Sequence, residues 1–311
     1  MGIEPATLQS QLFNRLSGAS CLRRGVEEYL EDVYWVVKET LTSSIKGRLC
    51  CLVVFGSAAR PEDFVKGLSD VDVLALTEDR PERRHYFFKA LDSEVHAVVF
   101  AVDEFRELVE HGDPLAFMMK HRIELHGSID DLLVNLKITE RTAEVLRGSA
   151  LAALGLALEH YYVLRDHVKA LSHLYHSVRH VARYKASLRG VFPVSDEEVL
   201  RECVDEQLRS LYWRLVKARR SEVDAGSLRC LMREAVSLIS SELGIKEASL
   251  EKLEEVAAGG AVMVTASEEN GCLAFKVEVF NGDRRVLEVV GDEVRETVKE
   301  DLGLAIKQRK H

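Results

Sequence analysis

The spacing of apolar residues changes twice along this chain of 311 residues, and each change predicts a different architecture. From about residue 25 to residue 130, strand-length apolar runs such as Leu49–Phe55 and Val71–Leu76 alternate with segments of helical spacing. Residues 139–258 keep helical spacing almost throughout, and strand patterns return after Gly259 and Gly260. The pattern predicts an α/β (α+β) domain with a short mixed sheet, an all-α helical bundle and a small β unit.

The same pattern sets the expected domain limits. We predict a helical lead-in, a first domain, a bundle and a small β-hairpin plus helix extension, over residues 1–24, 25–130, 131–258 and 259–311. A helix is expected over residues 85–91, and a last helix from Asp292 to about Lys307. Asn281 and Gly282 predict a type I′ hairpin turn, because both residue types tolerate positive φ.

The composition excludes several classes of protein. The longest apolar run, Ala150–Leu158, is far shorter than the roughly 20 residues that span a bilayer. With no basic, apolar leader at its start, the chain is expected to be cytoplasmic and to have no membrane partner. A net charge of −9 disfavours an extensive nucleic-acid-binding surface, though not a local basic patch. The six cysteines form no C-x-x-C pair, which disfavours a structural zinc site.

A candidate phosphate-binding bend follows the first apolar strand. Gly56 and Ser57 come directly after Phe55, and glycine lets a ligand approach the backbone closely. Backbone amides at a helix start favour an anion such as a phosphate, and the Ser57 hydroxyl adds a donor. Arg60 places a guanidinium about one turn later.

Two carboxylates stand at the start of the second strand. Asp70 and Asp72 are separated by one residue, so a strand would project both from one face, where they repel unless a cation sits between them. Carboxylate oxygens in a short spacing suit Mg²⁺ or Mn²⁺. Alone, the bend reads as an ordinary turn and the aspartates as a solvated strand edge. Together they indicate phosphoryl or nucleotidyl transfer.

The stretch "FGSAAR…SDVDVL" resembles the polymerase-beta-type nucleotidyltransferase superfamily, in particular its minimal archaeal and bacterial branch. The resemblance covers about residues 25–130. It implies binding of an NTP, most simply ATP, at Gly56 and Ser57, with Arg60 and Ser69 of the same motif as further nucleotide-binding candidates. It also implies metal ligation by Asp70 and Asp72.

The sequence departs from that family pattern in two places. Pro61 follows Arg60 where the family usually has glycine, and His96 stands where the family has a third aspartate. Glu94 lies two residues earlier, on the same strand face. Three interpretations stay open: His96 acts as the base, Glu94 reaches in, or the protein binds NTP with weakened catalysis. His96 by itself fits an ordinary sheet-face histidine equally well.

The helical part carries a local excess of basic residues between 165 and 190. Arg179 and Arg183 are four residues apart and share a helix face, which predicts contacts to phosphate or nucleic acid, or simply a solvated face. The stretch Arg183–Leu200, "RYKASLRGVFPVSDEEVL", resembles the HEPN or kanamycin-nucleotidyltransferase C-terminal helical domain. The Arg-x4–6-His spacing of ribonuclease members is missing, so no RNase activity is expected.

These features lead to one main functional hypothesis. The chain is expected to be a metal-dependent nucleotidyltransferase that moves AMP from ATP to a hydroxyl and releases pyrophosphate. The acceptor is a protein side chain, a small molecule or an RNA end. One alternative is a weakened NTP-binding regulatory or toxin–antitoxin-like module, and another is an RNA-binding protein. Residues 259–311 either pack on the bundle or form a homodimer interface.

Overall fold

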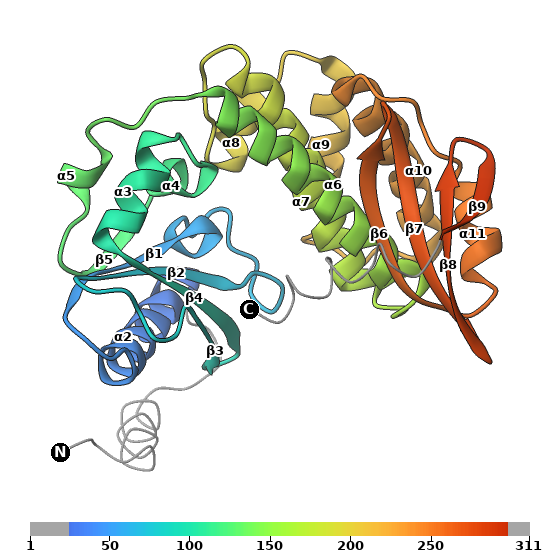
Figure 1. Ribbon diagram of the computed structural model, residues 1–311. Coiled ribbons are helices and arrows are strands. Elements are labelled where there is room, and N and C mark those ends of the chain that lie inside the picture. The colour runs from blue at the N-terminus through green and yellow to red at the C-terminus, as the bar shows by residue number, and fades with distance from the viewer. Residues whose placement is uncertain (1–24, 298–311) are drawn as a thin grey trace. The chain divides into compact units, whose positions relative to one another are not determined.

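The structure is a computed structural model that describes residues 25–297 (Figure 1). The lead-in helix predicted for residues 1–24 lies outside the described residues. The chain divides into two units, residues 1–137 and residues 138–311. Of the described helices, none has the length and apolar character needed to cross a membrane.

The first unit is built on a five-stranded mixed sheet in the order β3-β4-β2-β1-β5. Strands β2 and β4 run parallel, and the other neighbours run antiparallel. Its elements are α2 (Val26–Ser44), β1 (Leu49–Phe55), the 3₁₀ turn η1 (Gly56–Ala59), β2 (Val71–Thr77), β3 (His85–Ala90), β4 (Ser93–Ala101), α3 (Val102–Glu110), α4 (Pro114–Met118), β5 (Ile123–His126) and α5 (Asp130–Leu133).

Helices cover both faces of this sheet, as Figure 1 shows. Alternate residues of a strand face opposite sides, so each central strand contributes to two cores. Leu52 and Val73 belong to the core that α2 closes. Val53 and Leu74 belong to the core that α3 and α4 close. Burial on both faces explains why these strands read as continuous apolar runs.

The helix predicted for residues 85–91 is wrong. Residues His85–Ala90 form β3, which pairs antiparallel with β4. The segment is rich in aromatic residues, which favour a pleated, half-buried surface. Leu91 adopts a positive φ of 55° and turns the chain directly into β4, so that Ala90 pairs with Ser93. This tight hairpin leaves no room for a helical turn.

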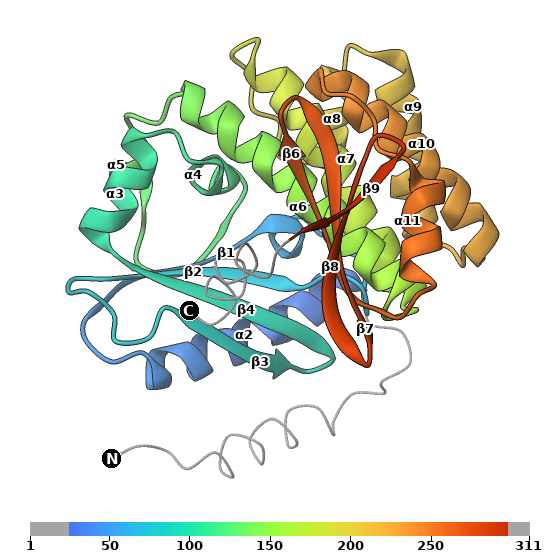
Figure 2. The ribbon, with the colours of Figure 1, turned by 45° about the vertical axis from the view of Figure 1, so that its right-hand side comes forward.

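The second unit combines helices with an antiparallel sheet in the order β6-β7-β8-β9. Figure 2 shows α6 and α7 side by side and the twisted sheet at the end of the chain. The elements are α6 (Glu140–Tyr162), α7 (His167–Ser187), α8 (Asp196–Glu202), α9 (Glu206–Ala218), α10 (Ala225–Leu243), α11 (Leu250–Ala257), β6 (Ala261–Glu269), β7 (Cys272–Asn281), β8 (Asp283–Val290) and β9 (Glu293–Thr297).

The helices and the C-terminal sheet share one hydrophobic core. Leu154 and Leu158 of α6 belong to the same buried cluster as Phe275 and Val277 of β7. Helix α6 also packs directly on β6. Strands β6, β7 and β8 therefore complete the hydrophobic core of the helices. The α/β, all-α and β-hairpin composition of the predicted fold class is confirmed.

Two details of the C-terminal prediction differ from the structure. A strand, β9, replaces the start of the helix expected from Asp292, because Glu293–Thr297 pair with the free edge of β8. The rest of that predicted helix lies outside the described residues. The β7–β8 hairpin forms at Asn281 and Gly282, but of the two only Gly282 has positive φ. Positive φ at both turn residues occurs at Asn270 and Gly271, which join β6 to β7.

Candidate functional site

Three residues form one row across an edge of the first unit's sheet. Phe55 at the end of β1 pairs with Asp72 near the start of β2, and Asp72 pairs with His96 on β4. Asp72 lies on the same sheet face as Leu74, two residues on, which packs under α3 and α4. The central strand thus carries the second aspartate of the motif between the Gly-Ser bend and the histidine.

The bend is pressed against the Asp72 carboxylate. Gly56 has a φ of +72°, and a Cβ added there would lie 2.9 Å from Asp72 Oδ2. The positive φ therefore favours glycine at this position, and a larger residue would also have to displace the Asp72 carboxylate. The half-buried Ser57 follows in a short 3₁₀ turn, which the Arg60 amide closes by donating to the Ser57 carbonyl at 3.0 Å. The sequence predicted this proximity of the Gly-Ser bend to Asp72.

The surroundings of Asp72 disfavour the charged form of its carboxyl group. Burial and, after it, the negative charge of Asp70 raise the pKa of its carboxyl to about 7, against the opposing effect of Arg60. Asp70 is exposed and directly precedes β2. Two carboxylates in this arrangement favour a bound cation, because a cation would remove both the repulsion and the cost of desolvation.

The donor set fits Mg²⁺ or Mn²⁺ only together with a phosphate ligand. Among residues 25–297, no group of three His, Cys, Asp or Glu side chains is arranged to hold a metal ion. Mg²⁺ commonly binds through one or two carboxylates, with substrate phosphates and water as the other ligands. Asp70 and Asp72 supply such a partial set, so the chemistry of these residues suits an ion that arrives with a nucleotide.

Arg60 has a different place from the one predicted. The side chain is 3% exposed, and its Nε donates to Asp63 Oδ2 at 2.6 Å. Both terminal nitrogens of Arg60 are buried without a hydrogen-bond partner. Its charge acts on Asp72, whose pKa it lowers. We therefore describe Arg60 as an internal counter-charge to Asp72, where the sequence predicted a residue that binds the nucleotide.

Ser69, the other nucleotide-binding candidate, is also buried. Its hydroxyl accepts a hydrogen bond from the Val65 amide at 3.0 Å, and its own amide donates to the Val65 carbonyl at 2.8 Å. These two bonds fix the loop between the bend and β2. Ser69 thereby holds the backbone that leads into Asp70.

His96 stands beside Asp72, as the sequence predicted for the third family position. Its Nε2 lies 3.1 Å from Nδ1 of His85 on β3. Burial lowers the pKa of His96, and the neighbouring His85 lowers it further. The ring is therefore neutral at pH 7. Glu94 is exposed and precedes Val95, the partner of Val71, so it lies at the same sheet edge as Asp70.

Sequence reasoning missed two residues of this site, His85 and Phe87. Both rings stack on His96, with centroid separations of 5.4 Å and 4.6 Å. The planes of Phe87 and His96 differ by 1°. Interpreting residues 85–91 as a helix hid this arrangement. The available signal was the run of ring residues over positions 85–88, a residue type that favours strands.

Arg179 and Arg183 do not form the basic surface that the sequence predicted. Each side chain is 4% exposed. Arg183 donates to the carbonyls of Pro193 and Val194 at 3.0 and 2.7 Å, and Arg179 donates to the same Val194 carbonyl. Arg179 also lies 3.6 Å from Asp196. The two arginines hold the turn before α8 inside the second unit.

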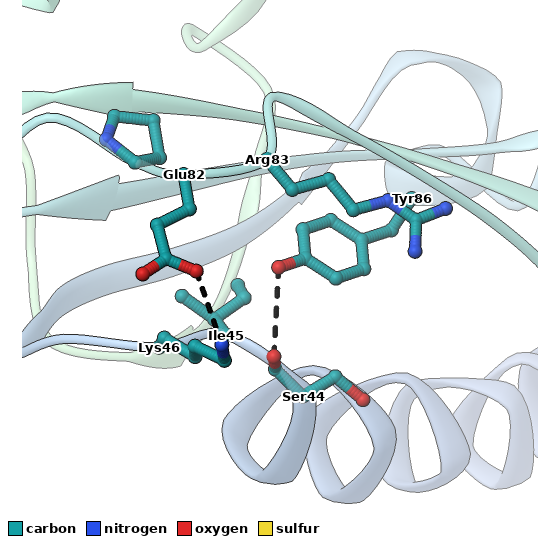
Figure 3. Close-up of a pocket in the computed structure, with 7 residues that line it drawn as sticks. Ser44, Ile45, Lys46, Glu82, Arg83 and Tyr86 are labelled. Carbon is teal, nitrogen blue, oxygen red and sulfur yellow. Dashed lines mark hydrogen bonds and ion pairs between the residues drawn. The ribbon is translucent and has the colours of Figure 1, made fainter.

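A pocket of about 470 Å³ lies on the opposite side of β3 from this site (Figure 3). Tyr86 lines it and packs with the α2 core, whereas His85 and Phe87 face the other way. Lys46 and Glu82 form an exposed ion pair at 3.1 Å on its rim. The pocket is thus separate from the Asp72 row.

Comparisons with known proteins give a weak likeness to a solved structure. The chain matches neither a protein-family model nor a curated protein sequence. Among solved structures, it is similar to a nucleotidyltransferase-like protein from Exiguobacterium sibiricum 255-15. The two are 13% identical, with a TM-score of 0.26, and the match covers 87% of this chain and all of the other. A TM-score of this size does not establish a shared fold.

Proposed function

We propose that this chain is a metal-dependent nucleotidyltransferase that transfers a nucleoside monophosphate, AMP from ATP, to a hydroxyl acceptor. One observation carries the proposal: the Gly56 backbone lies against the Asp72 carboxylate, with Asp70 beside it and His96 on the next strand. A Gly-Ser bend next to paired carboxylates is an arrangement that suits phosphoryl-group chemistry.

The residues of the chain have distinct roles in this reaction. The Gly56–Ser57 bend holds the triphosphate through backbone amides and the serine hydroxyl. Asp70 and Asp72 would hold Mg²⁺ or Mn²⁺, which supplies charge neutralisation at the phosphates. The acceptor oxygen forms a bond to the α-phosphorus while the bond from that phosphorus to the bridging oxygen breaks. Pyrophosphate leaves with the bonding electron pair, and the hydroxyl proton passes to Nδ1 of neutral His96.

The test is transfer of label from ATP. The protein is incubated with α-labelled ATP, Mg²⁺ or Mn²⁺ and cell extract, and labelled products are separated by gel and thin-layer chromatography. We expect Asp70→Asn and Asp72→Asn to lower transfer at least about a hundredfold, because each removes a metal-binding charge. The matched control is Asp79→Asn, which replaces an exposed aspartate just beyond the other end of β2. Equal transfer by Asp70→Asn and wild type would exclude the proposed role of the carboxylates.

A weakened NTP-binding module is the second candidate. It is favoured by His96 in place of a third carboxylate and by the lack of a three-ligand group in residues 25–297. Calorimetry distinguishes the two, since ATP binding in Mg²⁺ without any transfer would support the module. The RNA-binding alternative is weakened, because Arg179 and Arg183 are buried on carbonyls.

A further inference from the structure

We propose that Phe87 and His96 form a stacking site for the acceptor, and that the acceptor is nucleoside-like: an uncharged planar ring joined to its hydroxyl through a sugar-sized spacer. This inference rests on the proposed nucleotidyl transfer. It adds the chemical class of the acceptor and a specificity residue, Phe87.

The geometry of the displacement indicates from which side the acceptor hydroxyl approaches. In-line displacement requires the entering hydroxyl and the leaving pyrophosphate to lie on opposite sides of the α-phosphorus. The bend that would hold the leaving phosphates is on the β1 side of Asp72. The hydroxyl therefore approaches from the β4 side of Asp72. His96 lies on β4, and β3 is the next strand beyond it.

The surface on that side is aromatic and open. Phe87 pairs with His96 across β3 and β4, and its side chain is 68% exposed. The stacked His96 ring and the nearby His85 ring fix its orientation, with ring planes within about 15° of one another. An oriented, exposed aromatic ring beside a reaction centre offers a stacking face to a planar ligand.

The spacing narrows the chemical class of the acceptor. Phe87 lies two strands from Asp72, which is about 10 Å at the strand spacing of a sheet. A ring stacked on Phe87 can reach the α-phosphorus only through a spacer such as a sugar. Glu94 lies at this edge near Asp70, and the exposed Lys89 of β3 pairs with it across the strands. The opposite charges of Glu94 and Lys89 offset each other, so the exposed ring of Phe87 is what this side offers to an acceptor.

Acceptor competition tests the inference. The purified protein of residues 1–311 receives α-labelled ATP and Mg²⁺ with adenosine, N-acetyltyrosine amide or glycerol as the acceptor. We expect adenosine to be labelled, and the other two to be labelled at least about tenfold less. A preference for N-acetyltyrosine amide, for glycerol or for an added RNA oligonucleotide would overturn the proposed acceptor class.

Variants of Phe87 provide the second readout. Phe87→Ala is expected to raise the KM for adenosine about tenfold, and Phe87→Trp to restore it to within about threefold, because stacking depends on the ring face. Phe280→Ala, which removes a 59% exposed phenylalanine from β7, is the control. If Phe87→Ala instead weakens ATP binding in calorimetry and leaves the KM for adenosine unchanged, the ring site belongs to the nucleotide and the inference is wrong. Failure of the wild type to transfer label to any acceptor, with Asp70→Asn indistinguishable from it, would instead count against the proposed function.

Discussion

Asp72 holds a carboxylate where the protein surroundings favour its neutral form. Its pKa rises from an ordinary 3.8 to about 7 through burial and the charge of Asp70. The folded state therefore binds this proton more tightly than the unfolded state does. It follows that the carboxyl lowers the free energy of unfolding as the pH rises from about 4 to about 7.

Asp72→Asn should consequently stabilise the protein above pH 7 in the presence of a chelator. The size of the pKa shift of Asp72 predicts a gain on the order of 2–4 kcal/mol in the free energy of unfolding. This gain should vanish near pH 4. Urea unfolding at pH 4.5 and pH 8 in EDTA measures both values, with Asp79→Asn as the control. An equal free energy of unfolding for wild type and Asp72→Asn at pH 8 would show that the folded protein does not raise the pKa of Asp72.

The sequence predicted some of the site residues and missed others for a physical reason. Gly56 and Asp72 belong to one local motif whose chemistry depends on short spacing, so the residues themselves indicated their proximity. The positions of the Arg60 and His85 side chains depend on the path of a loop and on the pairing of a strand. Neither the Asp63 partner of Arg60 nor the ring contact of His85 leaves a mark in the local sequence.

At the scale of elements, the contact between α6 and β6 is unusually close. A Cβ added to Gly155 in α6 would lie 2.6 Å from the Ala266 amide nitrogen and 3.1 Å from Thr265 Cα in β6. These neighbours are backbone atoms of a paired strand, so they cannot move aside without disturbing the sheet. Glycine is the residue that permits this approach.

Gly155→Ala should therefore destabilise the second unit by about 1–3 kcal/mol through overpacking. Gly148 lies in the same helix with nothing within 4 Å of its added Cβ, so Gly148→Ala is the matched variant. That control should be neutral or gain up to about 1 kcal/mol from helix propensity. Thermal unfolding of the two variants checks the prediction, and equal midpoints would contradict it.

Elements were predictable where hydrophobic period and length agreed. Strands β1 and β2 are continuous apolar runs of strand length and were predicted within a residue or two of their observed ends. Strand β3 is short and carries charged neighbours, so pairing with β4 decides its conformation. The first residues expected in the last helix pair with β8 for the same reason. Long-range pairing overrides local propensity at such edges.

At the scale of the whole molecule, histidines of α7 make the free energy of unfolding depend on pH. Burial lowers the pKa of His173 to about 4, with His160 adding to the effect. Burial also lowers the pKa of His180 to about 3, helped by Arg183 and Arg179. Both imidazoles are neutral in the folded protein, whereas an unfolded chain protonates them near pH 6.5. Their stability contribution is present above that pH and is lost as the pH falls toward 4 and 3.

We expect the free energy of unfolding to decrease below pH 6.5 by up to about 1.4 kcal/mol per pH unit for each of these histidines. The double variant His173→Gln with His180→Gln should flatten this slope between pH 6.5 and pH 4.5 in urea unfolding. His126→Gln, which replaces an exposed histidine of β5, controls for loss of an imidazole. The same slope in wild type and in the double variant would contradict the assignment.

The core shared by α6 and β7 has a practical consequence for anyone shortening the protein. A fragment that stops at residue 258 would keep the helices that the structure describes in the second unit, yet it would expose the apolar side chains that Phe275 and Val277 cover. We expect such a fragment to aggregate, because its apolar surface would be exposed to water. The sounder place to cut is between residues 137 and 138, where the chain itself separates into two units.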